Sequence, residues 1–244
     1  MLDYSLTNLP FLSKLVLLIK RNYIVSKNSK MYTWVVQTQN ISDLISRKLF
    51  ISDSKIEILP LFDIDIFRNC NKSLAENNKN FLYVADSSEQ KNHILLLDSW
   101  QSFSKNILDS NVTLHLTLAS NSNQWLLRKI DLIKSKGFNI VNHGACTSDE
   151  IKELYSKCNF LIYPSLAESF GLPLIEATSA GCKVISSNLP YVYQVIEPSL
   201  TFNPHDSKSI TNALLASQNN NSIKSSKMLV ENKIIHLINK LSNV

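Results

Sequence analysis

The sequence predicts an α/β protein with a doubly wound, Rossmann-like parallel sheet, and three observations lead to this fold class. From about residue 80 onward, short apolar runs alternate with segments whose apolar residues recur at helical spacing. The runs are apolar throughout, which is typical of strands covered on both faces of a parallel sheet. All four glycines fall between residues 137 and 181, and glycine suits backbone that turns sharply or approaches a ligand.

Each predicted strand of this region is followed by a predicted helix. The strands are expected at 81–85, 112–119, 138–144, 159–165 and 182–187. The helices are expected at 91–103, 123–137, 147–158, 172–180 and 190–196. Thr147 or Ser148 can cap the third helix, and Pro173 suits the first turn of the fourth. Since crossovers between parallel strands are right-handed, this order favours a doubly wound sheet.

The two ends of the chain do not continue this alternation. Before residue 60 we expect a helix with a basic face at 9–32, a strand at 33–38, a capped helix at 40–50 and a strand at 55–60. Two strands do not make a domain. We therefore divide the chain into a partial domain at 1–60, a polar linker at 61–79, and a Rossmann-like domain at 80–218. The last segment, 219–244, consists of a polar linker followed by an amphipathic helix expected at 228–241.

Composition narrows the classes of function. The 244 residues carry a formal net charge of +5, too mild for a nucleic-acid-binding tail, so we expect no nucleic-acid partner. The cysteines are scattered with no CxxC pair, and the histidines lack metal-ligand spacing, so we expect no metal site. The N-terminus has an acid where a signal peptide is basic, and its apolar stretch is too short to span a membrane. We therefore expect a cytoplasmic protein. The tryptophans are expected in the core: Trp34, Trp100 and Trp125.

The stretch ESFGLPLIEA, residues 168–177, has the composition of a ligand site. Glu168 lies in the loop beyond the carboxyl end of a predicted strand, and Glu176 lies one turn into the following helix. Ligands bind at that edge of an α/β sheet, and a helix N-terminus attracts phosphate. One carboxylate could hold a ribose diol and the other a sugar beyond the phosphates, as in a nucleotide-sugar site. The alternative stays open, because the helix dipole alone favours an acid in the first turn.

The same stretch resembles the motif of two glutamates separated by seven residues in retaining GT-B glycosyltransferases of the family 4 type. The resemblance extends over 143–196 and 201–214, which look like that family's C-terminal, donor-binding domain. Residues 81–93 are similar to its first strand and phosphate-binding lysine loop, and 35–65 to the passage between its two domains. The resemblance implies a GT-B fold of which this chain has the C-terminal half and a partial N-terminal domain.

The resemblance also implies the role of each site residue. Glu168 would contact the donor sugar, Glu176 would bind the ribose, and Lys91 would neutralise the diphosphate. The remaining implied donor contacts are backbone at Ser169, Phe170, Gly171 and Leu172, and the base near His143 and Gly144. No cofactor or metal is implied beyond the nucleotide sugar itself. The loop VADSSEQK departs from the family, since it has neither the Arg nor the Gly that commonly precede the lysine.

Two functions from different classes remain open. In the first, the chain is a glycosyltransferase that transfers a hexose-type sugar to a saccharide or lipid-linked acceptor, in cell-surface polysaccharide synthesis. In the second, it is a non-catalytic nucleotide-sugar-binding module. Residues 1–60, the remnant of the other GT-B domain, would bind a second chain or self-associate through an apolar face at residues 12–19. The basic face of the same helix suggests contact with the inner face of the membrane.

Overall fold

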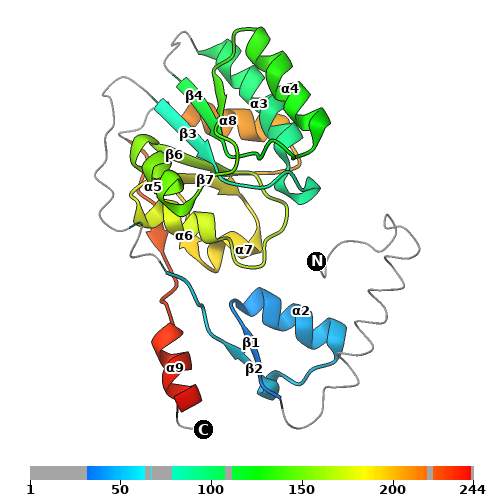
Figure 1. Ribbon diagram of the computed structural model, residues 1–244, viewed down its shortest axis with the longest axis vertical. Coiled ribbons are helices and arrows are strands. Elements are labelled where there is room, and N and C mark those ends of the chain that lie inside the picture. The colour runs from blue at the N-terminus through cyan, green and yellow to red at the C-terminus, as the bar shows by residue number, and fades with distance from the viewer. Residues whose placement is uncertain (1–31, 64–66, 68–78, 108–111, 219–221, 243–244) are drawn as a thin grey trace, which may run out of the picture. The chain divides into compact units, whose positions relative to one another are not determined.

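The computed structural model describes residues 32–63, 67, 79–107, 112–218 and 222–242 (Figure 1). The chain divides into two compact units, one formed by residues 1–62 with 231–244 and the other by residues 63–230. The basic helix expected at 9–32 and its apolar face at 12–19 lie almost wholly outside the described residues. The two units are taken in turn.

The larger unit contains the predicted parallel sheet, with a sixth strand at 200–202 that the sequence did not predict. Its six strands are β3 (Lys79–Tyr83), β4 (Val112–Leu116), β5 (Ile140–Asn142), β6 (Phe160–Tyr163), β7 (Lys183–Ser187) and β9 (Leu200–Phe202). They lie in the order β5-β4-β3-β6-β7-β9, and every neighbouring pair is parallel. This is the strand order of the Rossmann fold, so the predicted fold class is confirmed. The order reverses between β3 and β6, and the switch point of such a sheet is where ligands bind.

Helices cover both faces of this sheet. They are α3 (His93–Asn106), α4 (Gln124–Ser135), α5 (Ser148–Lys157), α6 (Leu172–Ser179), α7 (Pro190–Tyr193) and α8 (Ser207–Ala216). Figure 1 shows α3, α4 and α8 on one side of the sheet and α5 and α6 on the other. Local chemistry fixes the starts of two of them. Thr147 and Glu150 form a capping box on α5, with Thr147 one of the two predicted caps, and the Asn123 side chain caps α4.

Aromatic side chains fill the core between β3, β6 and α3. The Phe81 ring stacks on Phe160 with ring centroids 4.9 Å apart, and it meets Trp100 and Phe103 edge to face at 5.3 and 5.9 Å. All four rings are fully buried. The prediction that Trp100 lies in the core is therefore confirmed, while Trp125 is 56% exposed and its prediction is wrong.

The reason for the exposure of Trp125 is the position of the apolar stripe on α4. The residues of α4 that are buried are Leu126, Ile130 and Ile133, which are spaced four and three residues apart along one face. Trp125 precedes the first of them by one residue, so it is rotated about 100° away from that stripe. Its hydrophobicity alone suggested burial, and the helix phase overrides it.

The smaller unit has a two-stranded parallel sheet, β1 (Trp34–Val36) and β2 (Ile56–Ile58), with α2 (Gln39–Leu49) between them. A small core of Val36, Ile45, Leu49 and Ile51 joins the helix to the strands. Helix α9 (Ile234–Ser242) belongs to this unit, and Lys240 and His236 contact the carboxylate of Glu57.

The C-terminal helix begins later than predicted. We expected it from Met228, but Lys227–Met228 forms β10, which pairs antiparallel with β8 (Ile196–Glu197). The N–H of Leu229 continues this pairing by donating to the carbonyl of Val195. Asn232 then accepts from the Ile234 N–H at 3.0 Å and starts the helix. Of the helices that the structure describes, none is long and apolar enough to cross a membrane.

Candidate functional site

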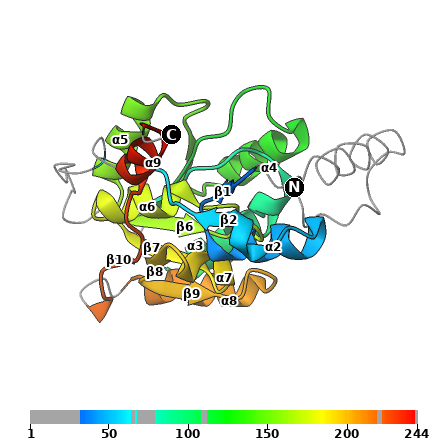
Figure 2. The same cartoon turned by 90° about the horizontal axis from the view of Figure 1, so that it is seen from below.

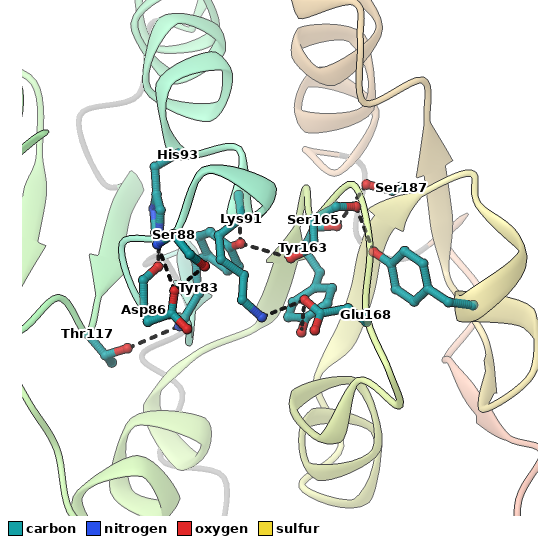
Figure 3. Close-up of polar contacts among 12 residues, drawn as sticks. Tyr83, Asp86, Ser88, Lys91, His93, Thr117, Tyr163, Ser165, Glu168 and Ser187 are labelled. Atoms are coloured by element: carbon teal, nitrogen blue, oxygen red, sulfur yellow. Dashed lines mark hydrogen bonds and ion pairs between the residues drawn. The ribbon is translucent and has the colours of Figure 1, made fainter. Parts of the chain in front are cut away.

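Two loops meet at the switch point of the sheet, one after β3 and one after β6. Lys91 ends a short 3-10 turn, Glu89–Lys91, between β3 and α3, and Glu168 lies in the loop between β6 and α6. The Lys91 Nζ lies 2.7 Å from the Glu168 Oε1 (Figure 3). The side chains are only 14% and 11% exposed. Two residues that the sequence named for separate parts of the donor are thus in direct contact.

Tyr163, the last residue of β6, completes this contact. Its hydroxyl donates to the same Oε1 atom of Glu168 at 2.8 Å (Figure 3). Burial, and then the negative charge of Glu168, raise the pKa of Tyr163 well above its usual range, so its hydroxyl stays protonated as a donor. Sequence reasoning missed Tyr163. The available signal was its place at the strand's carboxyl end, directly before the loop that carries Glu168.

Further hydroxyl groups fix the floor beneath this pair. The Tyr83 hydroxyl donates to the Lys91 carbonyl at 2.6 Å. The Ser165 hydroxyl lies 3.1 Å from the Tyr83 hydroxyl. The Tyr191 hydroxyl donates to the Ser165 carbonyl at 2.9 Å. Tyr83 and Ser165 are fully buried. The backbone of both loops is therefore held from below, on either side of the switch point.

Asn92, next to Lys91, joins three loops. Its backbone is left-handed, with φ of 57°, which asparagine tolerates better than most residues. Its side-chain amide donates to the carbonyls of Pro164 and Pro204, at 3.2 and 2.8 Å. These prolines follow β6 and β9, so one side chain holds the loops after three different strands.

A buried histidine at the start of α3 supports the loop between β3 and Lys91. The His93 Nε2 lies 2.7 Å from the carbonyl of Asp86, so this nitrogen carries the hydrogen. Burial lowers the pKa of His93 to about 4. The Asp86 carboxylate in turn accepts from the backbone and hydroxyl of Ser88. His93 is thus a neutral structural donor that shapes the lysine loop.

Gly171 shapes the other loop. It is the N-cap of α6, with φ of 84°. A Cβ at this position would lie 3.0 Å from the Cδ1 of Leu174, so both the backbone and the packing favour glycine. Ser169 is exposed, Phe170 is buried and Leu172 is 43% exposed. In the first turn of α6, Pro173 has no N–H and the Leu174 N–H donates to the Gly171 carbonyl at 3.0 Å. What this helix start offers an anion is therefore chiefly the positive end of the helix dipole.

Glu176 lies one turn into α6, as predicted, but it has a protein partner that the sequence did not show. The Tyr155 hydroxyl donates to its Oε2 at 3.0 Å. Burial raises the pKa of Glu176, against the lowering effect of this hydrogen bond. Its other oxygen has no hydrogen-bond partner among the described residues. The carboxylate is therefore oriented by Tyr155 and keeps one oxygen for a ligand.

His143 and Gly144 follow β5, at the same edge of the sheet. The His143 Nε2 lies 2.9 Å from the Nδ1 of His115, and the two rings stack with centroids 5.2 Å apart. Burial, and then the neighbouring His143, lower the pKa of His115 to about 4, and burial also lowers the pKa of His143. The pair is therefore neutral near pH 7, with one ring donating to the other. Gly144 has φ of 82° and open space where a Cβ would be.

The described residues hold no group of three or more histidine, cysteine, aspartate or glutamate side chains that could bind a metal ion. The cation that the structure brings to the switch point is Lys91.

Comparisons with known proteins fit this fold. Residues 66–235 match the family model described as "Glycosyl transferases group 1". The O-antigen chain mannosyltransferase RfbU of Salmonella typhimurium is 43% identical over 67 residues, which cover 27% of this chain and 19% of the relative. The sucrose-phosphate synthase of Thermosynechococcus elongatus superposes with a TM-score of 0.69 at 19% identity, over 88% of this chain and 54% of its own.

A second solved structure, Anabaena HepE in complex with UDP and glucose, gives a TM-score of 0.67 at 15% identity. It is matched over 83% of this chain and 58% of its own. The sheet order and these neighbours define a GT-B glycosyltransferase fold. Because the family model covers more than half of the chain, the chain belongs to the glycosyl transferases group 1 family. It spans little more than half the length of these solved structures and less of the curated relative.

Proposed function

We propose that the larger unit binds the nucleoside diphosphate sugar of a retaining glycosyltransferase of the family 4 type. The enzyme would transfer a hexose-type sugar to a saccharide or lipid-linked acceptor during cell-surface polysaccharide synthesis. It would act in the cytoplasm, at the inner face of the membrane. The observation that carries the proposal is the contact of Lys91 with Glu168 at the switch point of the sheet. Glu168 lies in the loop that leads directly to the N-terminus of α6.

The first step is binding of the diphosphate. Lys91 supplies one positive charge, and the N-terminus of α6, opened by the left-handed Gly171, supplies chiefly the positive end of the helix dipole. In the free protein the positive charge of Lys91 forms an ion pair with the Glu168 carboxylate. A diphosphate would take over Lys91 and release one bond to the Glu168 Oε1. Leaving-group charge is stabilised in this way without a proton transfer.

The second step is contact with the sugar. Once Lys91 turns to the phosphates, Glu168 still accepts from the Tyr163 hydroxyl, which keeps its position. Its free lone pairs can then accept from hydroxyls of the donor sugar. This order makes the diphosphate and the sugar bind cooperatively, because the first frees the acceptor for the second. Glu168 is the residue that would touch the donor sugar beside the reacting bond.

The third step fixes the nucleoside. Glu176, held by Tyr155, would accept from the ribose hydroxyls with its other oxygen. His143 and Gly144 would lie near the base, since both follow a strand at the same edge of the sheet. The names of the relatives support the substrate class: RfbU is a mannosyltransferase, and the HepE structure holds UDP and glucose. A hexose on a nucleoside diphosphate is therefore the donor proposed here.

A second candidate is a nucleotide-sugar-binding module without transferase activity of its own. The size of the smaller unit favours it, because the residues described there form a sheet of only two strands, which is marginal without further packing. Acceptor and donor must be held together for the large rate gain of proximity. We expect the purified chain to bind the donor but to show no transfer alone, and to self-associate or bind a second chain.

Titration calorimetry with UDP, GDP and ADP in the presence of EDTA tests the proposed donor site. We expect binding of at least one nucleotide, since Lys91 and the α6 helix dipole need no metal. Absence of heat with all three would refute it. An assay with a panel of nucleotide sugars and acceptors then separates the two candidates. Sugar transfer catalysed by a monodisperse monomer would exclude the second candidate, the module without transferase activity.

A further inference from the structure

Two large apolar side chains are exposed on the outer surface of α4. Trp125 and Leu132 are each 56% exposed. Single exposed apolar residues are ordinary, but these two are seven residues apart and so lie on one face of the same helix. The core of the larger unit uses an adjacent face of α4, about 100° away, with Leu126, Ile130 and Ile133. The exposed face therefore has no role in the sheet packing.

Trp125 and Leu132 line a groove between α4 and α3, which pack side by side (Figure 1). The groove has a volume of about 480 Å³. Its lining combines an aromatic ring, aliphatic groups, an amide and four charged groups: Asp98, Gln101, Trp125, Arg128, Lys129, Leu132, Ile133 and Lys136. None of these residues belongs to the donor site described above.

The groove carries more positive than negative side chains. The Lys129 Nζ lies 2.7 Å from the Asp98 Oδ1, so these two neutralise each other and link the helices. The same Nζ lies 5.5 Å from the centre of the Trp125 ring, close enough for a cation–π contact that steadies the indole. Arg128 and Lys136 are exposed and have no acidic partner in the part of the chain that the structure describes. The groove therefore holds two uncompensated positive charges.

We infer that this groove binds an anionic saccharide, meaning sugar rings that carry carboxylate or phosphate groups. The apolar face of a sugar ring fits the exposed indole of Trp125. The hydroxyl groups of the sugar would donate to the Asp98 carboxylate and the Gln101 amide oxygen. Its carboxylate or phosphate would form ion pairs with Arg128 and Lys136. An Arg side chain is especially suited to carboxylate and phosphate, because its donors match both geometrically.

The shape and charge of the groove favour a saccharide over an acidic membrane surface. Binding to a bilayer requires an exposed, flat apolar face. The apolar area of α4 instead lies in a groove between two helices. The Asp98 side chain is 45% exposed and would face the acidic headgroups without benefit. Toward a saccharide, the same carboxylate is a hydrogen-bond acceptor for hydroxyl groups. The inference goes beyond the donor site and does not depend on it.

The test uses the full chain and an oligogalacturonate, in which every ring carries a carboxylate, with a neutral maltooligosaccharide of equal length as the comparison. We expect the acidic probe to bind more tightly and to protect indole fluorescence from acrylamide quenching. Trp100 is fully buried and Trp34 is partly buried in the smaller unit, so the protection assigned to Trp125 is the part that Trp125→Ala abolishes. Trp125→Ala should weaken binding roughly three- to tenfold, the range of an aromatic contact. UDP titration of the same variant checks the donor site separately.

The neighbouring lysines of α4 provide a matched control. Lys136 lines the groove and Lys134 does not, although both are exposed. Lys136→Ala should weaken oligogalacturonate binding severalfold, and Lys134→Ala should leave it unchanged. Equal losses in both variants would mean non-specific attraction and would overturn the site. Lack of binding to the probe, or binding only to vesicles of acidic phospholipid, would overturn it as well. Unchanged UDP binding in these variants would show that the larger unit is still folded.

Discussion

Lys91 and Glu168 are 77 positions apart in the chain, yet the Nζ of one lies 2.7 Å from the Oε1 of the other. They belong to loops that follow β3 and β6, the neighbouring strands at which the order of the sheet reverses. The pair is largely shielded from water, so its charges matter more than those of a surface pair. A ligand phosphate must therefore compete with a carboxylate that is already in place.

The first prediction follows from that competition. Lys91→Ala should weaken UDP binding by about 1.5–3 kcal/mol, the range for a hydrogen bond to a charged group. Titration calorimetry measures the change. The exposed Lys208 in α8 serves as a control, and Lys208→Ala should bind UDP as the parent chain does. Equal affinity of the Lys91 variant and the parent would remove Lys91 from the diphosphate site.

The two glutamates should separate by ligand. Glu176→Ala should weaken binding of the bare nucleotide by about 1–3 kcal/mol, because the ribose loses a charged acceptor. Glu168→Ala should not weaken binding of the bare nucleotide, because it removes the carboxylate that competes for Lys91, and it should weaken only the nucleotide sugar. Both variants are titrated with UDP and with a UDP-hexose. If both lose the bare nucleotide equally, the separate roles are wrong and the stretch is only a structural helix start.

Tyr163 should act as a positioning residue for Glu168. Tyr163→Phe removes the hydroxyl that donates to Glu168, and it should lower nucleotide-sugar affinity by about 1 kcal/mol while bare UDP binds unchanged. Tyr191→Phe is the matched control, because it also loses one buried hydroxyl bond, but to Ser165. A similar loss of nucleotide-sugar affinity in both variants would indicate a general effect of packing.

Gly171 should be sensitive to a single methyl group. Gly171→Ala places a Cβ on a backbone with φ of 84° and only 3.0 Å from the Leu174 Cδ1. Left-handed backbone costs an alanine about 1–2 kcal/mol, and the close contact adds to it. Gly137→Ala has φ of 86° with open space around it, so it should lose less stability. Urea denaturation of both variants gives the difference, and an equal loss would show that Leu174 yields without cost.

Acid should destabilise the protein partly through His93. The folded protein holds its pKa near 4, below the ordinary 6.5. Between these values the unfolded chain binds a proton that the folded protein does not, so the free energy of unfolding falls as pH drops from 6.5 to 4. The full contribution is about 3 kcal/mol. His93→Gln should reduce this pH dependence, measured by urea denaturation across the window.

The sequence was sufficient for five of the six strands of the sheet and for the position of the two glutamates, whereas β9 was not predicted. The alternation of apolar runs and amphipathic segments predicted these five strands, and the cap at Thr147 followed from local chemistry. Glu168 was placed beyond the strand's carboxyl end because Pro173 marks a helix start. These features depend on neighbours within a few residues, which is why pattern and propensity predict them.

Contacts between distant segments could not be predicted in the same way. Nothing in the pattern around Tyr155 shows that it reaches Glu176, 21 positions away. Trp125 was misplaced because its hydrophobicity was read without the phase of its helix. The late start of α9 came from the pairing of β10 with β8, which competes with helix formation at Met228. In each case tertiary contacts decide between alternatives that are locally similar.

The side chain of Asn92 has a consequence for how a ligand can enter. One amide group holds the backbone that follows β6 and the backbone that follows β9, while its own residue follows β3. Opening any one of these loops would break bonds shared with the others, so the three behave as one rim with common rigidity. A donor would then pay little entropy to order the rim, and its arrival rate would depend on diffusion to a preformed surface rather than on loop motion within this unit.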